Sequence, residues 1–102
     1  MIFAVDFDGT LCEDKYPGIG EPNKLLIEEL IAAKKSSYKL ILWTCREGKE
    51  LDEAVEWCRE QGLEFDAVND NLPEVVERFG GNNNRKIFAH RYIDDRAISA
   101  CW

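Results

Sequence analysis

The chain has 102 residues, of which 20 are acidic and 13 are basic, and its formal net charge is −7. This length predicts a single domain over residues 1–102. The negative charge and the lack of a Lys/Arg-rich run argue against an extended nucleic-acid surface, because contacts to the phosphate backbone need clustered basic side chains. The apolar stretches are far shorter than the ~18 residues of a membrane span, and the N-terminus lacks the basic region of a signal peptide. We therefore expect a cytoplasmic protein with no membrane contact.

The spacing of the cysteines argues against a redox pair and against a zinc site. The four cysteines are widely separated and match neither a Cys-x-x-Cys pair nor a zinc-binding framework. In a chain without a secretion signal, we expect them to be reduced thiols.

The first half of the chain predicts two buried strands, joined by a loop and a helix. Met1–Phe7 is apolar and rich in strand formers, and it runs into turn residues. Residues 9–21 contain several glycines and a proline, which predict a loop or a small hairpin. Apolar residues at i, i+3 and i+4 spacing predict an amphipathic helix over 22–36, with Pro22 in its first turn. A second apolar run predicts a strand over Tyr38–Thr44.

The second half predicts two further helices and two further strands. An apolar face over Glu50–Gly62 predicts a helix that ends at the glycine. Phe65–Asn69 predicts a short strand, and residues 71–79 predict a short helix. Lys86–Ile93 predicts the fourth strand, which ends in two aspartates.

Alternating strands and helices predict an α/β fold with right-handed crossovers and a parallel sheet covered on both faces. We expect a three-layer, Rossmann-like arrangement with the strand order 3-2-1-4. Ligands in such sheets bind beyond the carboxyl ends of the strands, beside the first strand. The connections of residues 9–21 and 70–85 are too short for an inserted cap domain, so the site should be open.

Polar side chains follow three neighbouring strands of this predicted sheet. Asp6 and Asp8 end the first strand, Thr44 ends the second, and Asp94 and Asp95 end the fourth. Carboxylates gathered in one place repel each other, so they need either raised pKa values or a bound cation. Oxygen ligands of this kind suit Mg²⁺.

These residues, in this order, resemble the haloacid dehalogenase superfamily of phosphotransferases. Its signatures are Asp-x-Asp-x-Thr/Val, a strand that ends in Thr or Ser, a Lys, and an acidic pair. The matching segments here are DFDGTL at 6–11, LWT at 42–44, Lys86, and IDD at 93–95. The chain looks closest to small phage and bacterial members without a cap domain.

The resemblance implies a role for each matching residue. Asp6 would be the nucleophile that forms an aspartyl-phosphate, and Asp8 would protonate the leaving group and then deprotonate the hydrolytic water. Thr44 would donate a hydrogen bond to a phosphoryl oxygen. The implied Mg²⁺ ligands are Asp6, Asp8, Asp94 and Asp95. The implied substrate-binding residues are Gly9, Thr10 and Arg46.

Lys86 is the cation that the resemblance assigns to the phosphate. Eight residues separate it from Asp94, so a straight strand would place it up to ~26 Å away, at the opposite end of the sheet. Either the chain arches before His90, or Arg46 or Arg96 supplies the positive charge instead.

The sequence thus predicts a Mg²⁺-dependent phosphomonoester hydrolase that acts on a phosphorylated substrate. The alternative is a noncatalytic Mg²⁺- or phosphate-binding interaction domain of the same fold, and a receiver-type phosphoacceptor is a distant third. The chain ends soon after Asp95, which leaves a sheet edge that a homodimer or larger homo-oligomer would cover. Residues 69–71 would either select the leaving group at the rim of the site or form Asx turns. His90 has no second His or orienting carboxylate nearby in sequence, so a structural or exposed role is expected in place of proton transfer.

Overall fold

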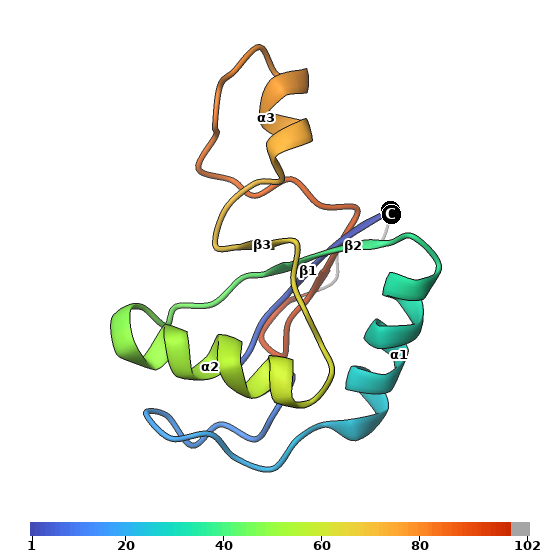
Figure 1. Cartoon of the computed structure of the whole chain (residues 1–102). Helices are drawn as coiled ribbons and strands as arrows, with labels where there is room; N and C mark the ends of the chain where they lie inside the picture. The colour runs from blue at the N-terminus through green and yellow to red at the C-terminus, as the bar shows by residue number, and fades with distance from the viewer. Residues whose placement is uncertain (99–102) are drawn as a thin grey trace.

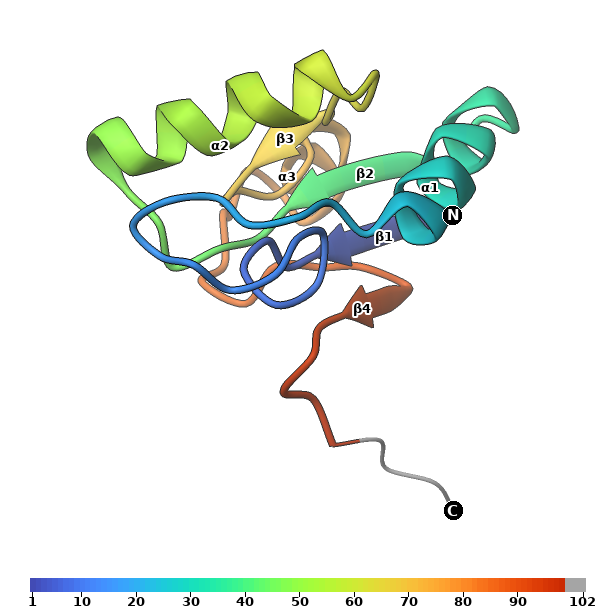
Figure 2. The same ribbon diagram turned by 90° about the horizontal axis from the view of Figure 1, so that it is seen from below.

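A computed structural model describes residues 1–98 as one four-stranded parallel sheet with helices on both faces (Figures 1 and 2). The strand order β3-β2-β1-β4 confirms the predicted order 3-2-1-4. In chain order the elements are β1 (Ile2–Val5), α1 (Lys24–Lys35), β2 (Lys39–Leu42), α2 (Gly48–Glu60), β3 (Ala67–Val68), α3 (Pro73–Arg78) and β4 (Arg91–Ile93).

The sheet separates two hydrophobic cores, as alternating side chains of the central strands require. Val5 and Leu42 face α1 and α2, whereas Ala4 and Ile41 face α3, and all four side chains are buried. Figure 1 shows the same division, with α1 and α2 on one side of the strands and α3 on the other. The predicted three-layer α/β architecture is therefore confirmed.

β1 lies between β2 and β4, and this central place positions the site. The amide of Trp43 donates to the carbonyl of Val5 at 2.8 Å, and the amide of Asp6 donates to the carbonyl of Ile93 at 2.9 Å. Asp6 therefore lies where the carboxyl ends of three parallel strands meet.

The predicted strand Lys86–Ile93 is wrong in its first five residues, because β4 contains Arg91–Ile93 alone. The preceding segment is held by side chains instead of sheet pairing. The buried Asn71 accepts the amide of Phe88 at 2.7 Å, and the hydroxyl of Tyr92 donates to the carbonyl of Ile87 at 2.5 Å. Ile87 is buried in the α3-side core. The chain therefore passes along that face of the sheet and turns back before β4 begins.

His90 makes this turn at the amino end of the sheet. Its Nδ1 atom accepts the amide of Ile2 at 2.9 Å, and its own amide donates to the carbonyl of Ile2 at 2.8 Å. The structural role expected for His90 is confirmed, at the end of β1 opposite Asp6.

The loop between β1 and α1 is a small hairpin. Cys12 forms an antiparallel bridge with Pro22, and the amide of Glu13 donates to the carbonyl of Glu21 at 2.9 Å. We call residues 13–21 the flap. α1 begins at Lys24, two residues later than predicted, because the Asn23 side chain caps it by accepting the amide of Leu26 at 3.4 Å.

Residues 1–98 contain no inserted cap domain, as predicted, and the longest helix is α2, with 13 residues. None of the described helices has the length and apolarity to cross a membrane. Cys12, Cys45 and Cys58 are free thiols, whereas Cys101 lies outside the described residues.

Candidate active site

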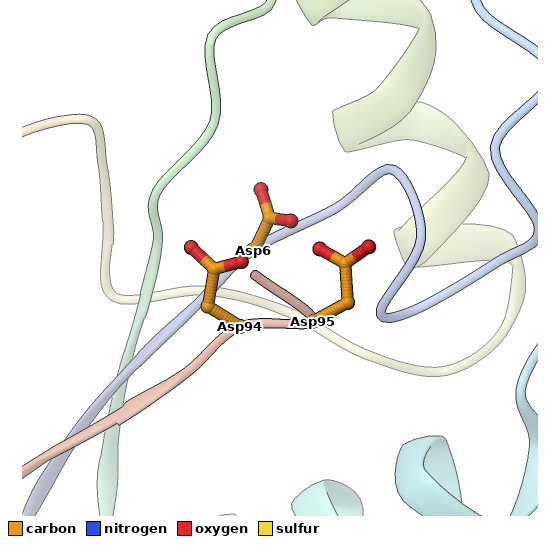
Figure 3. A group of neighbouring side chains, drawn as sticks. All are labelled: Asp6, Asp94 and Asp95. Atoms are coloured by element: carbon orange, nitrogen blue, oxygen red, sulfur yellow. The ribbon is translucent and has the colours of Figure 1, made fainter. Parts of the chain in front are cut away.

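Three carboxylates meet at the carboxyl edge of the sheet. Asp6 follows β1, and Asp94 and Asp95 follow β4. One oxygen of each can be chosen so that all three atoms lie within 4.8 Å of one another. Figure 3 shows the three carboxyl groups extending from the two chain segments toward the same side. We call these residues the acidic trio.

The pKa of Asp6 is raised by its surroundings in the acidic trio. Burial is the largest cause and the charge of Asp94 is the next, and together with Asp95 they raise this pKa from 3.8 to about 6. Hydrogen bonds from the Phe7 backbone and the Thr10 hydroxyl oppose the rise. A divalent cation among the three carboxylates would reverse the balance, since it favours the ionised form of each. The donor set therefore fits Mg²⁺, which prefers carboxylate oxygens.

Gly9 and Thr10 contact the acidic trio and help to position it. The buried Thr10 hydroxyl accepts the amide of Asp95 at 3.1 Å and donates to Oδ2 of Asp6 at 3.4 Å, so it ties the end of β1 to the end of β4. Gly9 has φ +85°, and a Cβ atom there would lie 2.9 Å from Cγ of Asp95. Only glycine allows this close approach without strain.

Gly9 and Thr10 were predicted to bind substrate, and in the structure their backbone amides have partners within the turn. The Gly9 amide donates to the carbonyl of Cys12 at 2.9 Å, and the Thr10 amide donates to the carbonyl of Phe7 at 3.1 Å. Both backbone donors are therefore already used within the turn, and the two residues instead position the trio.

A cleft of about 430 Å³ opens over the trio. Six of the predicted site residues line it, together with two residues of the flap and two further residues of the strand-end loops. The lining residues are Asp6, Asp8, Asp14, Tyr16, Thr44, Cys45, Arg46, Asp94, Asp95 and Arg96. The predicted site is thus largely assembled in one place.

Asp8 lines the cleft, but its carboxylate does not belong to the acidic trio, so the structure does not bring this predicted ligand together with the other three. Both of its oxygens face Arg46 instead. Nε and Nη2 of Arg46 each donate to one Asp8 oxygen at 2.8 Å, a bidentate pair. The hydrogen bond to Asp8 is the largest cause of a raised pKa for Arg46. This pairing engages both carboxylate oxygens of Asp8, so they are directed to Arg46 and not to the trio.

Arg46 does not fit its predicted role as a substrate ligand. Its side chain is 1% exposed, and its remaining N–H groups donate to the backbone carbonyls of Pro17, Gly18 and Glu50. A phosphate could bind this guanidinium only by displacing one of these partners.

Thr44 lies at the cleft, and within residues 1–98 its hydroxyl donates to no acceptor. Its Oγ1 atom accepts the amide of Arg46 at 3.1 Å, and a hydroxyl that accepts can still donate its own proton. Its amide donates to Oδ1 of Asn69 at 2.7 Å. Asn69 has φ +51°, a conformation that asparagine tolerates better than most residues. Asn69 therefore supports the loop that carries Thr44 through a bond between two strand-end loops, which is neither a local Asx turn nor a contact to a leaving group.

Lys86 does not line the cleft. Its side chain is exposed, and within residues 1–98 it forms no ion pair shorter than 4.0 Å. Arg96 does line the cleft, with a side chain that is 82% exposed and a long contact of 3.9 Å to Asp14. Of the predicted cations, Arg96 is the one positioned to meet an incoming anion.

Comparison with known proteins places the chain beside a conserved protein coded by a locus of Bacteroides thetaiotaomicron. The two sequences are 48% identical, and the match covers 96% of this chain and 78% of that chain, with a TM-score of 0.84. The chain belongs to the family of this conserved Bacteroides protein. No family model matches the sequence. No curated protein matches it either.

The flap supplies two cleft residues that sequence reasoning missed. Asp14 and Tyr16 both line the cleft, and Tyr16 is 58% exposed. Neither residue belongs to a recognisable pattern. The one available signal was the position of the loop directly after the first strand.

We expect the raised pKa of Asp6 to make the metal-free protein less stable above pH 6. Asp6 is neutral in both the folded and unfolded states well below pH 3.8, and between pH 3.8 and about 6 only the folded state retains the proton. The stabilising contribution of that proton is therefore lost as the pH rises through about 6. Since Asp6 is partly exposed to solvent, we expect the free energy of unfolding to fall by about 1 kcal/mol.

This loss is measured as the difference in free energy of unfolding between wild type and Asp6→Asn, in a chelating buffer, from pH 4 to pH 8. Asp52→Asn, an exposed substitution on α2, is the control. A wild-type/Asp6→Asn difference that does not change with pH would contradict the assignment.

Proposed function

We propose that the protein is a Mg²⁺-dependent phosphomonoester hydrolase of the haloacid dehalogenase superfamily, working through an aspartyl-phosphate on Asp6. The observation that carries the proposal is the acidic trio, with its three oxygens within 4.8 Å at the carboxyl edge of the sheet. Without a cation, the three carboxylates repel one another, and the raised pKa of Asp6 reflects this repulsion together with burial. With a cation, the same oxygens can serve as its ligands. The order of the motifs along the chain supports the same assignment.

In the proposed reaction, a carboxylate oxygen of Asp6 attacks phosphorus while the bond from phosphorus to the leaving oxygen breaks. Asp8 first takes up a proton in exchange for one of its two Arg46 hydrogen bonds and gives that proton to the leaving oxygen. It then accepts a proton from the water that attacks phosphorus in the second step. The second step releases inorganic phosphate and restores both carboxyl groups. Asp8 has this role because it lies on the cleft, two residues beyond Asp6 and outside the trio.

The remaining residues bind and orient the phosphoryl group. Thr44 donates its free hydroxyl proton to a phosphoryl oxygen, and Arg96 supplies positive charge from the rim of the cleft. Asp6, Asp94 and Asp95 would hold Mg²⁺. When bound, the cation would offset the charge of the trio and of the phosphate.

One observation favours a second candidate, a noncatalytic Mg²⁺- or phosphate-binding domain. The cation expected near the nucleophile, Lys86, does not line the cleft, and Arg46 has every donor engaged within the protein. Of the predicted basic side chains, this leaves the exposed Arg96 to assist the cation at an anionic transition state. The two candidates differ in turnover and agree on metal binding.

The deciding experiment is a panel of phosphomonoesters, small and bulky, assayed with Mg²⁺ and again with excess chelator. We expect Mg²⁺-dependent release of inorganic phosphate from at least one panel member and none with chelator. A thermal unfolding series on the same samples should show that Mg²⁺ raises the midpoint, since ligand binding to the folded state stabilises it. Stabilisation without turnover across the panel would favour the second candidate, and neither effect would contradict both.

A further inference from the structure

Arg46 has more contacts than a charge pair with Asp8 requires. A guanidinium carries five N–H donors, and all five are used here. Two donate to Asp8. The other three donate to the carbonyl of Pro17 at 3.1 Å, Gly18 at 2.6 Å and Glu50 at 3.3 Å.

These acceptors belong to three different parts of the site. Asp8 follows β1, Pro17 and Gly18 lie in the flap, and Glu50 lies in the first turn of α2. The guanidinium carbon also lies 5.0 Å from the centre of the Phe7 ring and 5.1 Å from that of the flap residue Tyr16. A single buried side chain therefore joins the proposed acid/base residue, the flap and a helix.

The outer part of the flap has few other attachments. Its base is closed by the pairing of Glu13 with Glu21. Beyond that base, Ile19 packs against the core, and Asp14 has a 3.9 Å contact to the exposed Arg96. Within the flap, the amide of Tyr16 donates to Oδ1 of Asp14 at 3.3 Å. In the described residues, the hydrogen bonds that join segment 16–19 to parts of the protein outside the flap are those from Arg46.

We propose that Arg46 is a latch: it orients Asp8 and holds the flap over the cleft at the same time, so that the two move together. The latch is a positioning residue, because its donors end on protein atoms and none remains for substrate. Opening the flap would break the bonds to Pro17 and Gly18 and free two donors beside Asp8. The catalytic consequence of the latch rests on the proposed function, whereas the coupling between Asp8 and the flap does not.

The coupling is tested by amide hydrogen exchange of the flap, read by mass spectrometry on peptides that cover residues 13–21. In Arg46→Lys, which keeps the charge but loses the planar fork, we expect flap exchange to rise about tenfold. In Asp8→Asn we also expect a rise, because the amide nitrogen of Asn cannot accept from Arg46, although in the structure the Asp8 side chain makes no hydrogen bond to described flap residues. Arg59→Lys, on the exposed face of α2, is the matched control and should leave the flap unchanged.

Turnover of an aryl phosphate gives the second readout. We expect Arg46→Lys to lower kcat about 10- to 100-fold with KM changed less than about threefold, since a misaligned acid/base slows chemistry more than binding. Mg²⁺ stabilisation should match wild type, because the acidic trio is intact. If Arg46→Lys does not fold, flap exchange in Asp8→Asn decides the question alone.

The proposal is overturned if folded Arg46→Lys, or Asp8→Asn where the former does not fold, leaves flap exchange at the wild-type rate. If wild type turns over no phosphomonoester, the proposed function fails, and the exchange experiment still decides whether Arg46 couples Asp8 to the flap.

Discussion

Replacing Asp6 by Asn is expected to abolish phosphomonoester hydrolysis and, in the same protein, to stabilise the metal-free fold. An amide cannot act as the nucleophile, so we expect kcat to fall by about 10⁴-fold or more. The stability gain has an electrostatic cause. The carboxylate of Asp6 is partly buried beside Asp94 and Asp95, and a neutral amide of the same shape ends that repulsion.

The opposite signs of these two effects make the test informative. A variant that loses activity because it unfolds would lose stability, whereas Asp6→Asn should unfold at a higher temperature than wild type in chelator at pH 7.5. Initial rates and thermal midpoints of wild type, Asp6→Asn and the control Asp52→Asn measure both effects. Wild-type activity in Asp6→Asn would remove the nucleophile from the proposal, and a lower midpoint would contradict the electrostatic account.

Gly9→Ala is expected to weaken Mg²⁺ binding from a position that touches no metal. The new methyl group would lie 2.9 Å from Cγ of Asp95, so that carboxylate must move away from Asp6 and Asp94. Loss of a group that positions metal ligands costs about 10- to 100-fold in metal affinity, and we expect a loss in this range. The left-handed backbone adds a separate penalty of about 1–2 kcal/mol to folding.

The chain offers a matched control that separates the two penalties. Gly80 also has a left-handed backbone, with φ +72°, but a Cβ atom there would have no neighbour within 4 Å. Gly80→Ala should therefore lose stability in the same way and keep the wild-type Mg²⁺ affinity, measured by calorimetric titration. Equal Mg²⁺ affinities for the two variants would show that the contact with Asp95 does not matter.

The sheet could be predicted because its strong signals are local. Met1–Phe7 and Tyr38–Thr44 are apolar runs bounded by turn residues, and the alternation of strands with helices leaves few ways to order four parallel strands. The segment before β4 was predicted wrongly for the same reason. Ile87 and Phe88 have the composition of a strand, yet Asn71 and Tyr92 hold them by side-chain bonds that span 17 and 5 residues of sequence. Such contacts leave no periodic pattern.

The acidic residues of the site could also be predicted, because their place at strand ends follows from the fold. What each residue contacts could not. Asp8 and Arg46 lie 38 residues apart in sequence, and their bidentate pair changes the role of both. Thr10 and Asp95 lie 85 residues apart, so the support of the trio by a hydroxyl was equally hidden. A motif identifies which side chains gather, whereas three-dimensional contacts determine which of them remain free for a ligand.

The His90 contact has a consequence for the alignment of β4 with β1. β4 pairs with β1 through three residues, with Val5 opposite Ile93. So short a pairing gives only weak resistance to a shift in register between the two strands. The two bonds between His90 and Ile2 fix the amino end of this pair, and the Thr10–Asp95 bond fixes the other end. A slip by one residue would shift the strand by about 3.3 Å and turn its side chains to the opposite face. A histidine at the far end of the sheet thereby determines which two side chains of the last segment meet Asp6.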